Sequence, residues 1–133
     1  MTEIKSEHID IQKPARDIFL FLNDFNNFEK LMPEQVVNWQ STTESCSFTI
    51  KGMASLEMHR QSVVEFSEIN LVSAGKSPFP FTLSCFLNDQ GNSTDAEMIL
   101  NADLNPMLKM MAKKPLQNFV NLLVGKLKVV MER

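Results

Sequence analysis

The chain has 133 residues, of which 44% are hydrophobic and 22% charged, with 13 basic against 16 acidic side chains. This composition is typical of a single globular domain over residues 1–133, and the net charge of −3 disfavours nucleic acid as a partner. No apolar run approaches the roughly 18 residues of a membrane-spanning helix, and the polar start lacks the order of a signal peptide. We therefore expect a cytoplasmic protein without stable membrane insertion.

The N-terminal third predicts one strand and two short helices. Residues 3–12 alternate weakly between apolar and polar and predict a strand with an irregularity near His8. Pro14 then opens a short helix, because proline suits the first helical position. Asparagine-rich turns separate this helix from a second short one, which Pro33 ends.

From Gln35 to Asp103 the apolar period changes to two, which predicts an antiparallel meander. We expect six strands, over residues 35–42, 45–51, 53–62, 63–74, 80–89 and 94–104. The clearest hairpin signal is Asn88-Asp89-Gln90-Gly91-Asn92. One face of these strands is apolar and should meet the last helix, and its members are Cys46, Phe48, Ile50, Leu56, Met58, Phe81, Leu83, Cys85, Leu87, Ala96, Met98, Leu100 and Ala102.

The last segment, Pro106 to Glu132, predicts a long helix with one buried side. Asn105-Pro106 is a good helix start. Pro115 lies inside the pattern and lacks the N–H that the Met111 carbonyl needs, so we expect either a kink at 111–115 or two helices meeting there. The buried stripe should consist of Leu116, Phe119, Val120, Leu123, Leu127 and Val130.

In order of elements and apolar positions, the chain resembles the helix-grip superfamily, which includes START lipid-transfer domains, the birch-pollen allergen group and polyketide cyclase-like (SRPBCC-type) proteins. The resemblance covers nearly the whole chain and ends with residues 105–127. It is carried by Ile9-Asp10-Ile11, Pro14-Ala15, Ile18-Phe19-x-Phe21-Leu22-x-Asp24, Phe28 and Leu31-Met32-Pro33. It implies an α+β helix-grip fold, in which a curved antiparallel sheet wraps round the C-terminal helix and leaves an apolar cavity.

The resemblance makes binding or transport of a small hydrophobic ligand the first functional hypothesis, the ligand being a lipid, quinone, sterol or polyketide-like molecule. Nine Met and ten Phe suit a variable apolar lining, although a filled core is the alternative. The loop Ser77-Pro78-Phe79-Pro80-Phe81 either covers the entrance of the cavity or is simply a Pro-punctuated turn. The expected lining is Phe48, Leu56, Met58, Leu83, Cys85, Met98, Leu108, Met111 and Phe119, with Arg60 at its end.

Arg60 shares the strand parity of Leu56 and Met58, so its guanidinium either holds an anionic ligand group or reaches solvent or Glu68. A polyketide cyclase-like enzyme is the alternative function. It is disfavoured because His59 and Glu57 fall on the opposite, wet face, and we assign no catalytic residue. The two histidines form no zinc pattern, so no metal and no cofactor are expected. Cys46 and Cys85 are expected to be buried free thiols.

Charge is distributed unevenly along the chain. From Pro106 onward there are six Lys or Arg and one acid, a balance of +5, whereas the first 105 residues carry seven basic and fifteen acidic side chains, a balance of −8. This basic helix either meets an anionic ligand or membrane surface, or stabilises its own C-terminus against an acidic sheet. A third possibility is a ligand-free interaction module, monomeric or homodimeric, that uses an exposed stripe around Asn118, Asn121 and Gly125.

Overall fold

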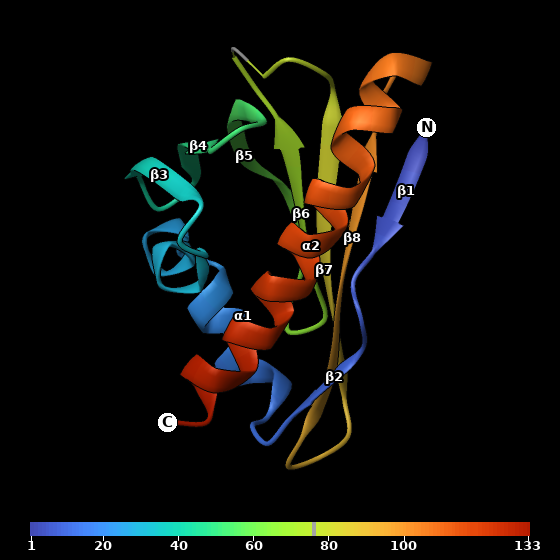
Figure 1. Cartoon of the computed structure of the whole chain (residues 1–133). Helices are drawn as coiled ribbons and strands as arrows, with labels where there is room; N and C mark the ends of the chain where they lie inside the picture. Colours follow the sequence, from blue (N-terminus) through green and yellow to red (C-terminus); the bar gives the residue numbers. More distant parts are fainter. Residues whose placement is uncertain (76) are drawn as a thin grey trace.

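The computed structural model describes residues 1–75 and 77–133. Its elements follow the predicted order of strand, short helices, further strands and one long helix (Figure 1). They are β1 (Thr2–Lys5), β2 (Ile9–Ile11), α1 (Ala15–Leu22), the 3-10 helix η1 (Phe25–Leu31), β3 (Val36–Ser41), β4 (Ser45–Ile50), β5 (Ala54–Val64), β6 (Glu68–Ser73), β7 (Phe81–Asp89), β8 (Thr94–Ala102) and α2 (Pro106–Met131).

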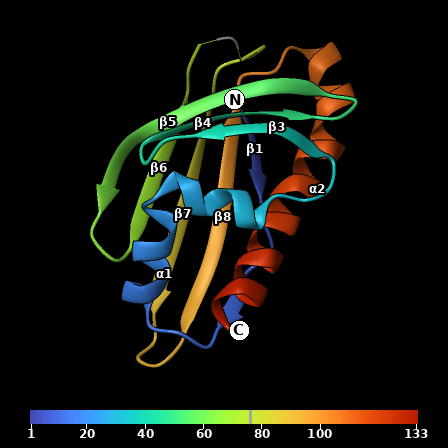
Figure 2. The ribbon, with the colours of Figure 1, turned by 90° about the vertical axis from the view of Figure 1, so that its left-hand side faces the viewer.

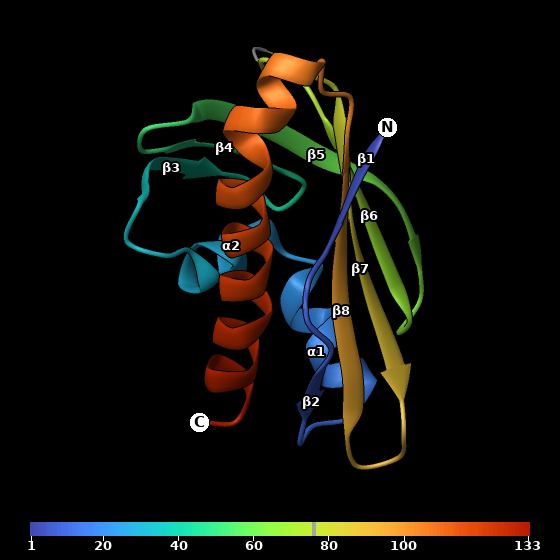
Figure 3. The same ribbon diagram turned by 45° about the vertical axis from the view of Figure 1, so that its right-hand side comes forward.

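The strands form one 8-stranded antiparallel sheet in the order β1-β8-β7-β6-β5-β4-β3, with β2 also paired to β8. The sheet is strongly curved. β3, β4 and β5 extend towards α2, whereas β6, β7 and β8 run at a steep angle to them (Figure 2). The helices all lie on the concave face, where α2 packs against β8 and α1 packs against β6 and β7 at the lower end of the sheet (Figure 3). The predicted α+β helix-grip fold is confirmed.

The inward faces of the strands are those that the alternation predicted. Every member of the predicted apolar face is buried, and the residues between them are half-buried or exposed. The two cysteines on this face are free, and burial raises the pKa of both thiols to about 12. Neither thiol is therefore ionised near neutral pH.

The predicted irregularity near His8 is a break between β1 and β2. The Ser6 N–H donates to the Met98 carbonyl at 2.8 Å, and Ser6 Oγ accepts the Met98 N–H at 2.9 Å, so β8 keeps its hydrogen bonds across the break. Helix α2 holds the same segment, since the Glu7 N–H donates to Asn121 Oδ1 at 3.0 Å. The break is thus fixed from both sides.

The predicted boundary between strands 53–62 and 63–74 is wrong. β5 continues to Val64, and the turn to β6 consists of residues 65–67. Phe66 adopts a left-handed conformation there, with φ 66°. Its ring packs edge-on against Phe19 of α1 at 5.6 Å between ring centres, and the Arg16 guanidinium lies 5.9 Å from the ring centre. Tertiary packing therefore stabilises this turn, although residues 65–67 include no Gly, Pro or Asn.

α2 is one continuous helix through Pro115, so the alternative of two helices meeting there is wrong, whereas the kink remains a prediction. The buried stripe agrees with the sequence analysis, except that Val130 is only half-buried. None of the helices in the described part of the chain combines the length and hydropathy needed to cross a membrane.

Candidate functional site

An apolar pocket of about 100 Å³ lies where α2 begins, at the end of the sheet. Its described lining comes from the β4–β5 turn, the β6–β7 loop and the first turns of α2, namely Gly52, Met53, Ala54, Pro78, Phe79, Leu108, Met111 and Ala112. The volume has room for several water molecules, at roughly 10–15 Å³ each, or for a small apolar group. Three segments that are distant in sequence thus form the walls of one apolar pocket.

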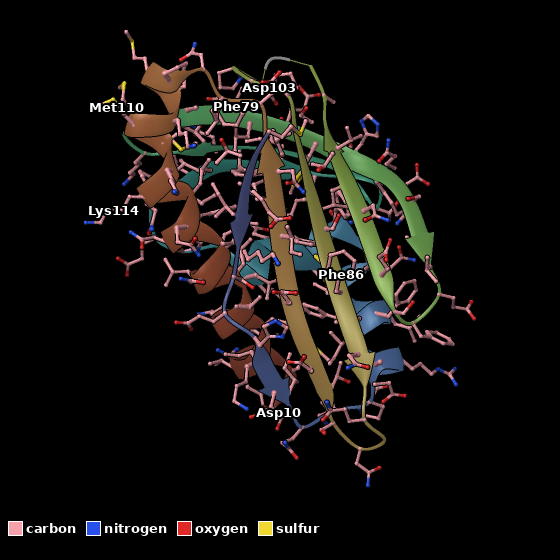
Figure 4. All side chains as sticks on the ribbon, turned by 90° about the vertical axis from the view of Figure 1, so that its right-hand side faces the viewer. Asp10, Phe79, Phe86, Asp103, Met110 and Lys114 are labelled. Carbon is pink, nitrogen blue, oxygen red and sulfur yellow. The ribbon has the colours of Figure 1, made fainter. Side chains whose placement is uncertain are left out.

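Phe79 forms one wall of this pocket. Pro78 and Pro80 flank it and fix the backbone torsion on both sides. The ring is only 5% exposed and lies edge-on to Phe81, with 6.0 Å between ring centres. Figure 4 shows Phe79 at the same end of the sheet as the first turns of α2. The ring therefore closes the pocket from the side of the loop.

The β6–β7 loop is fastened to β5 through Glu57. The Ala74 N–H donates to the Glu57 carbonyl at 2.8 Å, and the Glu57 N–H donates to Ser77 Oγ at 3.0 Å. Gly75 has φ 56° and packs directly on the Glu57 carboxylate, where a Cβ would overlap the carboxylate atoms. The positive φ favours glycine here, and a Cβ would have to displace the carboxylate end of Glu57. The wall that carries Phe79 is thereby held in place.

The opposite wall is the start of α2. Asn105 Oδ1 accepts the Leu108 N–H at 2.9 Å and caps the helix. Leu108 is half-buried, Met111 is 68% exposed, and Ala112 is the first fully buried residue of the helix. Met111 therefore lines the pocket with part of its side chain and meets solvent with the rest. This wall thus combines a buried alanine with two longer side chains that partly meet solvent.

Next to the pocket, the space between sheet and helix is filled by an aromatic stack. Trp39 stacks on Phe48 at 5.5 Å between ring centres, and Phe48 stacks on Phe119 of α2 at 5.9 Å. Phe48 pairs with Leu56 across β4 and β5, and Leu56 lies two residues beyond the pocket residue Ala54 on the same face. The stack therefore lies beyond the inner end of the pocket.

The predicted lining residues divide into two groups. Leu108 and Met111 line the pocket. The others are close-packed in the core at 5% exposure or less, and they are Phe48, Leu56, Met58, Leu83, Cys85, Met98 and Phe119. The sequence analysis did not select Met53, Ala54 or Ala112. The signal for Met53 was its position directly after the Lys51-Gly52 turn.

Arg60 lies on β5, and its partners are Asn23, the C-cap residue of α1, and Glu44 in the turn between β3 and β4. Nη1 is 2.6 Å from the Asn23 carbonyl and 2.9 Å from Asn23 Oδ1, and Nη2 is 3.4 Å from Glu44 Oε1. A bulge follows Arg60 in the pairing with β6, which turns the strand at this point. The guanidinium donates to the carbonyl of the α1 C-cap residue Asn23, and its ion-pair partner is Glu44 rather than Glu68.

The candidate acid and base side chains lie outside the pocket. His59 is exposed, and Glu68 is half-buried on the outer face of β6, where it accepts a hydrogen bond from Asn70 Nδ2 at 2.7 Å. Among residues 1–75 and 77–133, none of the pocket-lining side chains is titratable. The described pocket can therefore bind by apolar contact, and its lining offers no proton-transfer group.

Comparison with known proteins supports the fold. No family model and no curated protein matches the chain. Among solved structures, the XoxI protein of Bacillus cereus aligns with a TM-score of 0.77 at 9% identity, over 99% of this chain and 96% of its own. A START superfamily protein of Mycobacterium smegmatis aligns with a TM-score of 0.70 at 15% identity, over 98% and 97%. A conserved protein of Geobacillus kaustophilus gives 0.74 at 8%, over 98% and 95%. At these identities the likeness is one of fold.

Proposed function

We propose that this protein binds a small hydrophobic ligand between its sheet and α2, and that the ligand enters through the pocket beneath the first turns of α2. Lipid, quinone, sterol and polyketide-like molecules are the chemical classes that such a site suits. The proposal rests chiefly on one observation, the apolar pocket whose walls are Phe79, Met53 and Leu108. Apolar walls with few polar groups are usual for small-molecule sites.

The pocket is the closed form of this site. Ligand sites usually measure about 300–1,000 Å³, several times the 100 Å³ found here. Binding therefore requires the first turns of α2 to move outward, and Pro115 weakens the helix where such a movement would hinge. Met111 has an unbranched side chain that adapts to different ligand shapes. The Phe48–Leu56 pair would form the inner end of the widened site.

The direct test is to extract purified protein with organic solvent and identify co-purified molecules by mass spectrometry. We expect one class of apolar molecule at up to one equivalent per chain. The matched variants are Ala112→Leu, which places a larger side chain in the pocket, and Gly125→Leu, which adds the same side chain to α2 at a position where a Cβ meets no packed atom within 4 Å. Ligand should be lost from the first and retained by the second. Equal ligand content in both variants would contradict the proposal.

A further inference from the structure

The first turns of α2 expose three methionines. Met107, Met110 and Met111 are 72%, 87% and 68% exposed. Large apolar side chains gathered in this way on one surface are uncommon in soluble proteins and mark interaction sites. Figure 4 shows Met110 pointing away from the sheet on the side of α2 that also carries Lys114. Met111 also lines the pocket, but Met107 and Met110 do not, so the pocket does not account for their apolar side chains.

Three lysines alternate with the methionines along the first turns of α2. Lys109, Lys113 and Lys114 are exposed, and within residues 1–75 and 77–133 none of them forms an ion pair. The segment 106–118 contains no acidic residue. Cations near a helix N-terminus are disfavoured by the helix dipole, and the first turn of α2 has no acidic side chain to offset them. The helix dipole therefore does not explain Lys109, the lysine nearest the start of α2.

A broad, open depression of about 650 Å³ runs along the same segment. The three lysines, Pro106 and Met110 line it, together with two polar side chains of the following turn. Exposed lysines beside exposed methionines match the layers of an anionic bilayer, in which phosphates lie above the acyl chains. A nucleic acid would satisfy the lysines but leave the methionines in water.

We propose that the methionine–lysine face, which consists of Met107, Lys109, Met110, Met111, Lys113 and Lys114, docks this protein on the surface of an anionic membrane. The methionines enter the boundary between headgroups and acyl chains, and the lysines contact lipid phosphates. Docking does not depend on the proposed pocket, but it would bring the pocket entrance to the lipid surface, since Met111 belongs to both.

Vesicle sedimentation tests the proposal with the full chain. We expect binding to phosphatidylcholine vesicles that contain phosphatidylglycerol, weakening as salt is added, and little binding to phosphatidylcholine alone. Changing all three lysines of the face to Gln should weaken binding about a hundredfold, at about fivefold for each lysine. The charge-matched control changes Lys13, Lys30 and Lys126 to Gln, and its binding should stay within a fewfold of the wild type.

A second variant separates docking from ligand binding. Met107 and Met110 do not line the pocket, so Met107→Ser with Met110→Ser should reduce vesicle binding at least tenfold while uptake of an apolar fluorescent probe in vesicle-free buffer stays unchanged. Thermal unfolding checks that each variant is folded. Wild-type protein that stays in the supernatant with anionic vesicles would overturn the proposal. So would equal losses in the two lysine variants, which would point to net charge alone, or capture of the face by a protein partner without vesicle binding.

Discussion

Pro115 follows Met111 by four residues in α2 and has no N–H to donate to the Met111 carbonyl. The two residues mark the boundary between the first turns of the helix, which line the pocket, and the part that is buried along the sheet. A proline inside a helix costs about 3 kcal/mol, and it recovers up to about 1 kcal/mol by restricting the unfolded chain. Pro115 thus destabilises the folded protein at this boundary by about 2 kcal/mol net.

Pro115→Ala should therefore raise the free energy of unfolding by about 2 kcal/mol, because Pro115 is exposed and its removal leaves no cavity. Amide exchange of residues 108–114 should become slower, and so should ligand uptake. Chemical denaturation and hydrogen exchange measure these effects. Asn118→Ala, at an exposed position one turn away, is the control and should gain only about 0.5 kcal/mol from helix propensity. Lower stability in Pro115→Ala would contradict the hinge.

Arg60→Met should lower the free energy of unfolding by about 1.5–3 kcal/mol, the range for hydrogen bonds to a charged group. The loss follows from the two contacts that Nη1 makes with Asn23. Asn23→Ala removes only the side-chain contact and should cost less. If Arg60→Met instead keeps full stability and loses affinity for anionic ligands, the guanidinium belongs to a ligand site.

Gly75→Ala should destabilise the loop that carries Phe79. A left-handed conformation costs a non-glycine residue about 1–2 kcal/mol, and overlap with the Glu57 carboxylate adds to that cost. Gly91→Ala is the control, since Gly91 also has a positive φ but its Cβ would meet nothing within 4 Å. Denaturant unfolding should therefore show a larger loss for Gly75→Ala, and Glu57→Ala should partly restore it. Equal losses at both glycines would mean that the close packing is unimportant.

His8 should make stability depend on pH. Its ring nitrogens lie 3.0 Å from Asp95 and 2.9 Å from Glu97, and the hydrogen bond to Asp95, followed by the charges of both carboxylates, raises the pKa of His8 above its usual 6.5. The protonated ring thus favours the folded state. This contribution is complete below pH 6.5 and is lost as the pH rises through the folded pKa.

Unfolding measured against pH for wild type and His8→Gln tests this dependence. The stability difference should be largest below pH 6.5 and should shrink as the pH rises above that value. Glu132 does not interfere with this test. Contacts with Lys128 and the Gln12 N–H lower the pKa of the Glu132 carboxyl below 4.5. The stability that this carboxylate contributes is therefore lost only in more acidic solution. A difference that does not vary with pH would exclude a role for the His8 charge.

The sequence predicted the fold well wherever a local signal existed. Alternation identified the inward faces of the strands, the weak pattern near His8 predicted the break, and Asn105-Pro106 marked the start of α2. The β5–β6 turn was misplaced because Phe66 takes its left-handed conformation through packing with Phe19, which no local pattern encodes.

The candidate site was predicted only in part, for a similar reason. Leu108 and Met111 were identified from the apolar start of α2, but the other walls come from loops whose meeting depends on the curvature of the sheet. Phe48 and Phe119 were also expected to line a cavity, because the resemblance to the helix-grip superfamily implied one. Their rings stack on one another, and the space is filled at that level. Sequence periodicity shows which side chains face inward, and the packing density at each level has to come from the structure.

The measurement that tests the ligand-binding account most directly is titration of a neutral apolar fluorophore, such as N-phenyl-1-naphthylamine, into delipidated protein. The account predicts saturable binding at one site in the wild type and in Gly125→Leu, together with a change in the fluorescence of Trp39, the one tryptophan of the chain. Ala112→Leu should lose this binding while unfolding as cooperatively as the wild type. Absence of saturable binding in the wild type, or equal affinity in Ala112→Leu, would contradict a ligand site beneath α2.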